Sequence, residues 1–392
     1  MKVLCIGGAG AICREAVYDL LQYGCFDSLT ISDLNSKATE EVAGWLGDDR
    51  VRVRGIDLHD RPAALRAISG YDFVIDGTPI SVNDRVIELA AEAGVSGINL
   101  NGLSREWEFG DAFKACRQAF VPGFGMTPGV TNLLAMKAAT RMETVSEVYI
   151  SHGAFRPIAF SRAICETTVV EYDPGLKTRT VYEDGEFVQV PPFARPREVE
   201  LPEPFGTHPQ YIIPHPEAMT LSRSLAGKGV RLIEVRGTWP PRNMELLRVL
   251  YDWGMLSNPR VTVDGAEVGV LDVISEYLLS SEAGTITELY GYSLHVEVMG
   301  TADGKVSRRV LTTTHPPSDG SVPEWAGLRA YTRSVGIAFA IGADLMMRGR
   351  VKGIGTLAPE TAFDPDEVLV ELSRRRIRVQ EKAECAPLAT AS

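Results

Sequence analysis

One segment of the sequence places a histidine and a carboxylate where proton transfer would be favoured. His215 lies in the segment Pro214-His215-Pro216-Glu217, whose prolines restrict the backbone just before a predicted helix. A rigid backbone would hold the imidazole ready to act as a general base, and Glu217 could orient it or hold a substrate ammonium group. The alternative is a histidine in a surface loop, with Glu217 as an acidic residue at a helix N-terminus. The residues alone leave both interpretations open.

Arg236 offers a different kind of chemistry. It follows the apolar stretch Val230–Val235 and precedes a glycine, a position from which a guanidinium could grip a carboxylate through two hydrogen bonds. A structural ion pair is the alternative. His152 is expected near a strand end, where a buried structural histidine is the favoured interpretation. Glu166 and Glu171 lie on a segment whose structure the pattern does not predict, and both are left without a role.

A glycine-rich segment near the N-terminus could bind phosphate. The run Gly7-Gly8-Ala9-Gly10-Ala11-Ile12-Cys13 joins a buried strand to a helix. Glycines there permit a tight turn and a close approach of the backbone to a pyrophosphate, and the helix N-terminus adds free N–H groups. Cys13 stands where a third glycine is usual, but that position needs only a small residue. We therefore predict that Gly8 to Ile12 bind a dinucleotide, with an ordinary glycine turn as the alternative.

Asp33 strengthens this prediction and indicates which dinucleotide binds. It ends the second predicted strand, at about the distance expected for an acid that accepts a hydrogen bond from a ribose hydroxyl. A carboxylate there repels the 2′-phosphate of NADP, so NAD is the predicted cofactor, although Lys37 could partly accommodate a phosphate. The alternative role for Asp33 is that of a helix N-cap.

The elements that must position these residues follow from the hydrophobic pattern. Short apolar runs alternate with amphipathic stretches up to residue 121, which predicts a parallel sheet with helical crossovers, the Rossmann arrangement. Beyond Gly129 the chain becomes β-rich, with Asp-Gly hairpin signals, and the proline-rich stretch 191–216 is predicted as an ordered loop. We predict an α/β protein with a Rossmann domain at 1–125, an α+β substrate and dimerisation domain with an antiparallel sheet at 126–328, and a segment at 329–385 that returns to the first domain.

Composition excludes several classes of function. A chain of 392 residues is long enough for two domains, and its formal net charge of -11 disfavours binding to nucleic acid or to an anionic membrane surface. No apolar stretch approaches the length that spans a bilayer, and no signal peptide is visible. The six cysteines show no zinc-site spacing, so we expect no metal and a cytoplasmic protein with reduced thiols.

Several blocks of sequence together resemble the saccharopine dehydrogenase (glutamate-forming) and lysine 6-dehydrogenase family. The resemblance implies a Rossmann domain, an inserted substrate domain, reversible oxidation at a carbon that bears an amine, and often a dimer. Cys13 departs from the family pattern, and so does Asn99, which stands where relatives often carry an acid and which we predict to contact substrate. The blocks are Gly8-Ala-Gly10 with Arg14, Asp76-Gly-Thr78-Pro79 with Asn83, Pro122 to Asn132, His215-Pro-Glu217, Arg236-Gly237, and Gly349 to Ile377.

The remaining candidate residues are predicted from their places at strand ends. Thr78 and Pro79 follow the fourth strand and would touch the ribose or nicotinamide, and Asp57 and Leu58 would lie near adenine. The loop from Gly125 to Gly129, with Thr127 at its centre, would lie beside nicotinamide and contact substrate, with a hinge as the alternative.

The predicted function is NAD(P)-dependent oxidation of a C–N bond in a lysine-like or saccharopine-like amino acid by a homodimer. One alternative is a reductase that joins an amine to an aldehyde or keto acid, as in carboxynorspermidine formation. The other is a catalytically silent dinucleotide-binding regulator.

Overall fold

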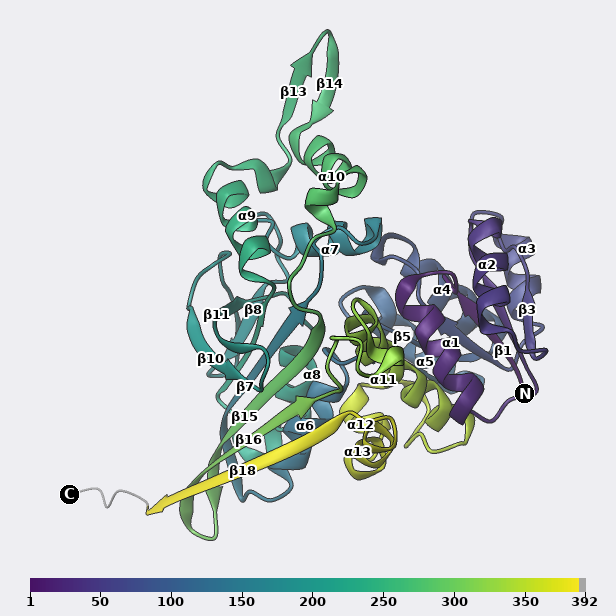
Figure 1. Ribbon diagram of the computed structural model, residues 1–392. Helices are drawn as coiled ribbons and strands as arrows, with labels where there is room; N and C mark the ends of the chain where they lie inside the picture. The colour runs from purple at the N-terminus through teal and green to yellow at the C-terminus, as the bar shows by residue number, and fades with distance from the viewer. Residues whose placement is uncertain (388–392) are drawn as a thin grey trace. The chain divides into compact units, whose positions relative to one another are not determined.

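The computed structural model describes residues 1–387, which fold into two compact units (Figure 1). The first unit takes in Met1–Lys137 and Thr332–Arg378, and the second takes in Ala138–Tyr331 and, of the described residues, those from Val379 to Pro387. The boundary predicted after residue 125 therefore lies inside the first unit. The predicted return segment 329–385 divides between the units, because its last strand belongs to the second.

The first unit contains a parallel sheet of seven strands in the order β17-β6-β5-β4-β1-β2-β3. The strand order reverses between β1 and β4, as in doubly wound dinucleotide-binding folds. The predicted Rossmann-type α/β unit is thus confirmed. Its strands are β1 (Lys2–Ile6), β2 (Ser28–Ser32), β3 (Val51–Val53), β4 (Phe73–Asp76), β5 (Ser96–Asn99), β6 (Ala119–Val121) and β17 (Gly355–Thr356). Its helices are α1 (Ala11–Tyr23), α2 (Ser36–Leu46), α3 (Arg61–Ile68), α4 (Ile80–Ala93), α5 (Gly110–Ala115), most of α6 (Val130–Ala139) and of α11 (Arg329–Met347), α12 (Pro359–Ala362) and α13 (Pro365–Arg374).

Buried ion pairs attach the C-terminal part of this unit to helix α1. Arg375 donates from Nε to Asp19 Oδ2 at 2.7 Å, and both side chains are buried. On α11, Arg333 lies 3.3 Å from Glu15, and a Cβ on Gly336 would lie only 2.8 Å from the Cβ of Glu15. The helix that follows the glycine-rich turn is therefore clamped by residues from the far end of the chain.

The second unit contains a mixed sheet in the order β10-β11-β12-β7-β15-β16-β18, with β8 beside β12 and β9 beside β8. Most neighbours are antiparallel, as predicted, but β12 runs parallel to β7. The strands are β7 (Thr144–Phe155), β8 (Thr180–Glu183), β9 (Glu186–Gln189), β10 (Arg197–Leu201), β11 (Gly206–Ile212), β12 (Leu232–Thr238), β15 (Gly291–Ala302), β16 (Lys305–Thr314) and β18 (Arg378–Pro387). The helices are α7 (Arg162–Val170), α8 (Glu217–Ser224), α9 (Pro241–Asp252) and α10 (Val270–Ser280).

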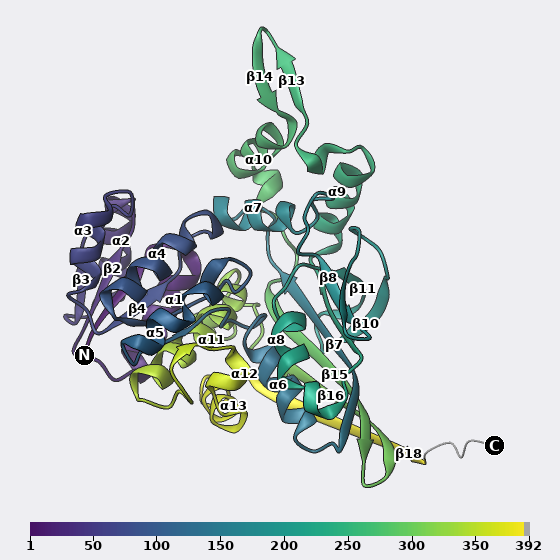
Figure 2. The ribbon, with the colours of Figure 1, turned by 180° about the vertical axis from the view of Figure 1, so that it is seen from behind.

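The register of this sheet decides which side chains share a face. His152 of β7 lies opposite Gly237 of β12 and Leu294 of β15. A Cβ on Gly237 would lie 2.7 Å from Cε1 of His152, so glycine leaves the room that the imidazole occupies. Helix α8 covers one face of the same sheet (Figure 2).

The proline-rich stretch 191–216 is not the loop that was predicted, because two strands, β10 and β11, lie within it. Pro209 pairs with Glu198 of β10, whereas β11 pairs with β12 only at Tyr211 and Ile212. A proline lacks a backbone N–H, but it breaks no hydrogen bond where its strand has no neighbour on that side. The prolines of this stretch therefore lie at strand ends or where the backbone N–H would have no strand beside it.

The three Asp-Gly hairpin predictions are confirmed. Each pair has positive φ at both residues, for example 49° at Asp264 and 82° at Gly265, as a two-residue type I′ turn requires. The second of these turns joins β13 (Arg260–Val263) to β14 (Ala266–Gly269), a separate two-stranded sheet that projects beyond α10 (Figure 1). Within residues 1–387, the structure contains no helix with both the length and the apolar character needed to cross a bilayer.

Candidate functional site

The glycine-rich turn has the geometry of a phosphate cradle. The N–H groups of Gly7 and Gly8 donate to the carbonyl of Ser32, which ties the turn to the end of β2. Gly7 has φ of +74°, and a Cβ there would lie 2.7 Å from the carbonyl oxygen of Gly77. Gly10 caps α1 without a side-chain hydrogen bond, so the first amides of this helix have no partner one turn earlier.

Cys13 fits the turn because the residue facing it, Gly77 at the end of β4, is a glycine. A Cβ on Gly77 would lie 1.9 Å from Sγ of Cys13, so any larger residue would displace the thiol. A third glycine in such motifs allows close packing of helix and strand. Here Gly77, just after β4, makes that space instead. The departure from the family pattern at Cys13 therefore does not argue against dinucleotide binding.

Asp33 lies just beyond β2, and its Oδ1 accepts from the N–H of Asn35 at 3.2 Å. The N-cap of α2 is Asn35, whose Oδ1 accepts from the N–H of Ala38. Asp33 is therefore not the helix cap, which was the alternative interpretation. Its carboxylate is partly exposed at the strand end, where a ribose hydroxyl would be expected.

A buried polar network follows the ends of β4 and β5. Asp76 accepts from the N–H and hydroxyl of Thr78, and its other oxygen accepts from Nδ2 of Asn83 at 2.5 Å. Asn83 Oδ1 accepts in turn from Asn99 and Asn101, each at 3.1 Å. Burial raises the pKa of Asp76 to about 7, against the opposing effect of these hydrogen bonds. The network fixes Thr78 and the start of α4, which Pro79 caps.

The predicted contact between Asn99 and substrate does not agree with this arrangement. Asn99 is fully buried, and its Oδ1 accepts from the N–H groups of Gly123 and Asn101 while Nδ2 donates to Asn83. A side chain with these partners holds neighbouring loops together. The amide of Gly125 is also used within the protein, because it donates to the carbonyl of Pro128 at 2.7 Å. The N–H of Gly125 is therefore not available to bind substrate in this structure.

The other predicted contact residues lie at the surface or in the core. The Thr127 hydroxyl donates to that of Thr131 at 3.2 Å. Asp57 is exposed, and its carboxylate accepts from the N–H of His59. Leu58 packs in the core of the first unit, and its carbonyl accepts from Nη1 of Arg85 at 3.1 Å.

These residues fit a nicotinamide dinucleotide. The turn between β1 and α1 excludes side chains at Gly7 and Gly8, since a Cβ at either position would lie within 3.0 Å of another atom. The first amides of α1 provide donors, and Asp33 provides an acceptor one strand away. Pyrophosphate would lie against the turn from Gly8 to Ile12, and the adenosine ribose would lie against Asp33.

In the second unit, His215 lies between two carboxylates. Its Nδ1 is 3.5 Å from Oε2 of Glu217, and its Nε2 is 3.9 Å from Oε1 of Glu171. Glu217 is fully buried, and the side chains of His215 and Glu171 are each 13% exposed. Burial alone would lower the pKa of His215, but the two carboxylates outweigh it and raise that pKa to about 10. The imidazole is therefore an imidazolium ion at neutral pH.

A second histidine, His152, lies beside His215, and its pKa is shifted in the opposite direction. The rings of His152 and His215 are 5.8 Å apart, and the ring of Tyr292 stacks on His152 at 5.5 Å. Burial, followed by the charges of His215 and Arg156, lowers the pKa of His152 well below its usual value. Environments that shift the pKa values of two neighbouring groups in opposite directions are typical of acid–base sites. The expected buried histidine is thus part of the cluster that contains His215.

Glu171 is the functional candidate that the sequence did not reveal. It follows the last turn of α7, and Arg179 fixes its backbone by donating from Nε and Nη2 to the Glu171 carbonyl and from Nη2 to that of Asp173. A cation at a helix C-terminus is favoured by the helix dipole. Arg179 therefore sets the position from which Glu171 reaches His215.

Arg236 lies on the opposite face of the sheet from this cluster. It is next to Gly237, which lies opposite His152, and successive side chains of a strand point to opposite faces. Its Nη1 donates to Glu234 at 2.5 Å, and its Nε and Nη2 donate to the carbonyl of Arg195. This geometry favours the structural ion pair rather than the predicted carboxylate grip.

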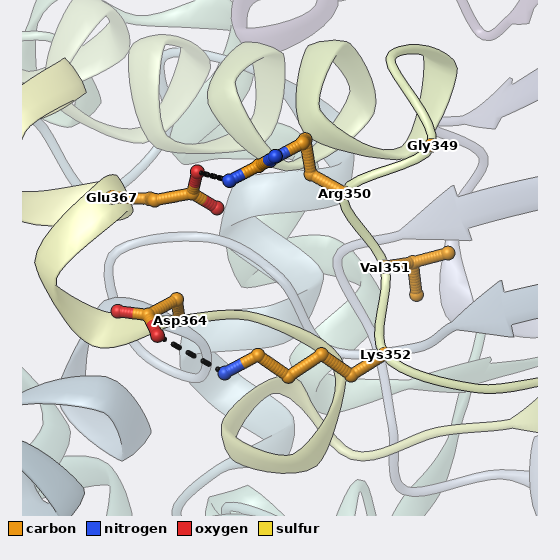
Figure 3. Close-up of a pocket in the computed structure, with 6 residues that line it drawn as sticks. All are labelled: Gly349, Arg350, Val351, Lys352, Asp364 and Glu367. Atoms are coloured by element: carbon orange, nitrogen blue, oxygen red, sulfur yellow. Dashed lines mark hydrogen bonds and ion pairs between the residues drawn. The ribbon is translucent and has the colours of Figure 1, made fainter.

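An open pocket of about 340 Å³ in the first unit is lined by charged side chains (Figure 3). Arg350 pairs with Glu367, and Lys352 pairs with Asp364 at 3.1 Å. Because both cations already have carboxylate partners, this pocket is not a candidate anion site.

Comparison with known proteins agrees with these features. Residues 3–120 match the family model for the saccharopine dehydrogenase NADP binding domain, and residues 125–377 match the model for the saccharopine dehydrogenase C-terminal domain. The fold is similar to that of apo saccharopine dehydrogenase (L-Glu forming) from Saccharomyces cerevisiae, with 16% identity, a TM-score of 0.73, and coverage of 98% of this chain and 99% of that one. Looser likenesses include a probable dehydrogenase from Thermotoga maritima, with 12% identity, a TM-score of 0.46 and coverage of 97% and 98%. The chain belongs to the saccharopine dehydrogenase family of dinucleotide-binding oxidoreductases.

Proposed function

We propose that this protein is a nicotinamide-dependent dehydrogenase that oxidises a C–N bond of a lysine-like or saccharopine-like amino acid. The observation that carries the proposal is the position of His215 between Glu171 and Glu217 in the second unit. Two largely buried carboxylates favour a cation beside them, and the substrate's ammonium group is such a cation. The imidazole between them can exchange a proton with the nitrogen.

Oxidation of an amine requires that the nitrogen first lose a proton, so that its lone pair can form the C=N bond as hydride leaves the carbon. The nicotinamide ring, when bound, accepts that hydride. An ammonium ion beside Glu171 and Glu217 would place a like charge next to His215 and lower its pKa. The imidazolium would then release its proton to solvent, to which its side chain is 13% exposed, and the neutral imidazole could accept the proton of the substrate nitrogen.

Asp33 supports NAD as the preferred cofactor, since its carboxylate would repel a 2′-phosphate. The matching family model is described as an NADP binding domain. In this chain the exposed Lys37 lies within 3.9 Å of Glu41, which offsets part of its charge. We therefore propose NAD as the working cofactor and NADP as the weaker one.

One observation favours a second candidate, the reductase that joins an amine to an aldehyde or keto acid. Since the pKa of His215 is about 10, the protein without ligand holds a proton donor at this position. A proton donor assists loss of water from the carbinolamine that precedes the imine. The two candidates use the same residues and differ in the second substrate.

The experiment follows the absorbance of reduced nicotinamide in both directions. Amines, L-lysine and saccharopine included, are screened with NAD⁺, and amine–aldehyde pairs are screened with NADH. We expect His215→Gln to lower the rate by about two orders of magnitude or more, the contribution typical of general acid–base catalysis. His59→Gln, which changes an exposed histidine of the first unit, is the matched control. No turnover in either direction, or an unchanged rate for His215→Gln, would refute the proposal.

A further inference from the structure

Arg156 is a buried cation without a carboxylate partner in residues 1–387. It directly follows β7 and is only 3% exposed. Two other buried arginines have carboxylate partners, Asp19 for Arg375 and Glu234 for Arg236, and the buried Arg179 donates three times to the backbone carbonyls of Glu171 and Asp173. A buried charge is costly unless it is paired. Arg156 therefore has a charge that a bound anion would compensate.

The guanidinium of Arg156 is held in place but is not saturated. Its Nη1 donates to the carbonyl of Pro157 at 3.2 Å, and its Nη2 donates to the hydroxyl of Thr168 at 2.7 Å. A guanidinium has five N–H donors, and the buried Nε has no hydrogen-bond partner among the described residues. The unused donors suit a carboxylate, which accepts two parallel hydrogen bonds from arginine.

Aromatic rings connect Arg156 to the proton-transfer cluster. Its guanidinium lies 5.4 Å from the ring centre of Tyr331, whose ring is 5.6 Å from that of Tyr292. Tyr292 stacks on His152, which neighbours His215. The row of rings therefore has His215, flanked by two carboxylates, at one end. At the other end it has Arg156, which lacks a carboxylate partner. A ligand along the row would find its ammonium favoured at one end and its carboxylate favoured at the other.

We propose that Arg156 holds a carboxylate of the substrate, several bonds from the nitrogen that His215 serves. This inference rests on the proposed function and names the specificity-determining residue of the same site. It assigns to Arg156 the role first predicted for Arg236. The substrate class is then an amine whose reacting nitrogen is separated from a carboxylate by a chain of carbon atoms.

The first test compares L-lysine with cadaverine, which differ only by the carboxylate. We expect the wild type to favour lysine in kcat/KM by about 10- to 100-fold, the value of a charge-assisted bidentate contact. Arg156→Met should abolish this preference, and Arg156→Lys should retain only part of it because ammonium lacks the planar fork. Arg236→Lys should discriminate as the wild type does. If Arg156→Met preserves the preference for lysine, the proposal is overturned.

The second test does not depend on turnover. Valerate carries a carboxylate and no amine, and its binding is measured by calorimetry. We expect Arg156→Met to weaken valerate binding at least about tenfold, whereas Arg236→Lys binds as the wild type does. Equal binding by wild type and Arg156→Met, or binding by neither, contradicts the role of Arg156. Valerate binding that needs Arg156, with no turnover of any amine, supports the carboxylate site and refutes amine oxidation.

Discussion

Replacing Glu171 with glutamine should lower the pKa of His215 while leaving the fold intact. Two carboxylates at 3.5 and 3.9 Å raise that pKa to about 10, in spite of burial. An opposite charge within this distance shifts a pKa by about 1–3 units. Glu171→Gln keeps the shape of the side chain but removes its charge, so we expect the His215 pKa to fall to roughly 7–9.

The assay is an NMR titration of protein labelled at histidine, with the His215 resonance identified by its loss in His215→Gln. The matched control is Glu166→Gln. Glu166 is exposed on α7, the helix that Glu171 directly follows, and its replacement should leave the titration of His215 unchanged. Because folding raises this pKa above 6.5, the stabilisation it contributes is complete below pH 6.5 and is lost as pH rises toward about 10. The variant should therefore lose thermal stability mainly on the acidic side of that range. A wild-type His215 that titrates near 6.5, or a variant that titrates as the wild type does, would refute the reasoning.

Three further predictions concern other parts of the chain. Asp33→Ser should improve binding of NADP relative to NAD by about tenfold, which calorimetry with both nucleotides measures; an unchanged ratio would contradict the assigned role. Gly77→Ala should destabilise the protein by about 1–3 kcal/mol in urea unfolding, because the new methyl group meets the thiol of Cys13. Adding Cys13→Ala should restore most of that loss, and failure to do so would mean that the clash is not the cause. Arg236→Met should cost about 3 kcal/mol in unfolding, because the buried Glu234 would keep only its longer contact of 3.4 Å with the more exposed Arg195, yet it should leave KM for the amine unchanged.

The Rossmann unit was predictable because its signals are local. Buried parallel strands are continuous apolar runs such as Val3–Ile6, and the glycine-rich turn follows directly. The Asp-Gly turns were equally local. Strands β10 and β11 were missed because a proline argues against a strand only when its N–H is needed, and that depends on which strand lies alongside. The parallel pairing of β7 with β12 likewise arises from segments far apart in the chain.

The candidate site was only half predictable for the same reason. His215 and Glu217 are separated by one residue, so their association is visible in the sequence. Glu171 reaches His215 from the end of α7, a segment distant in the sequence, and no local pattern indicates this. Arg236 was predicted to bind a carboxylate, with a structural ion pair as the alternative, because the sequence does not reveal that Gly237, and not Arg236, shares a face with His152.

The most direct test of amine oxidation follows a label from the substrate. L-lysine deuterated at its amine-bearing carbons is incubated with the protein and NAD⁺, and the reduced nucleotide is analysed by mass spectrometry. If hydride leaves a carbon that bears nitrogen, the NADH formed should carry deuterium and should form more slowly than with unlabelled lysine. NADH without deuterium, or no NADH at all, would contradict the assignment of lysine-type oxidation to this protein.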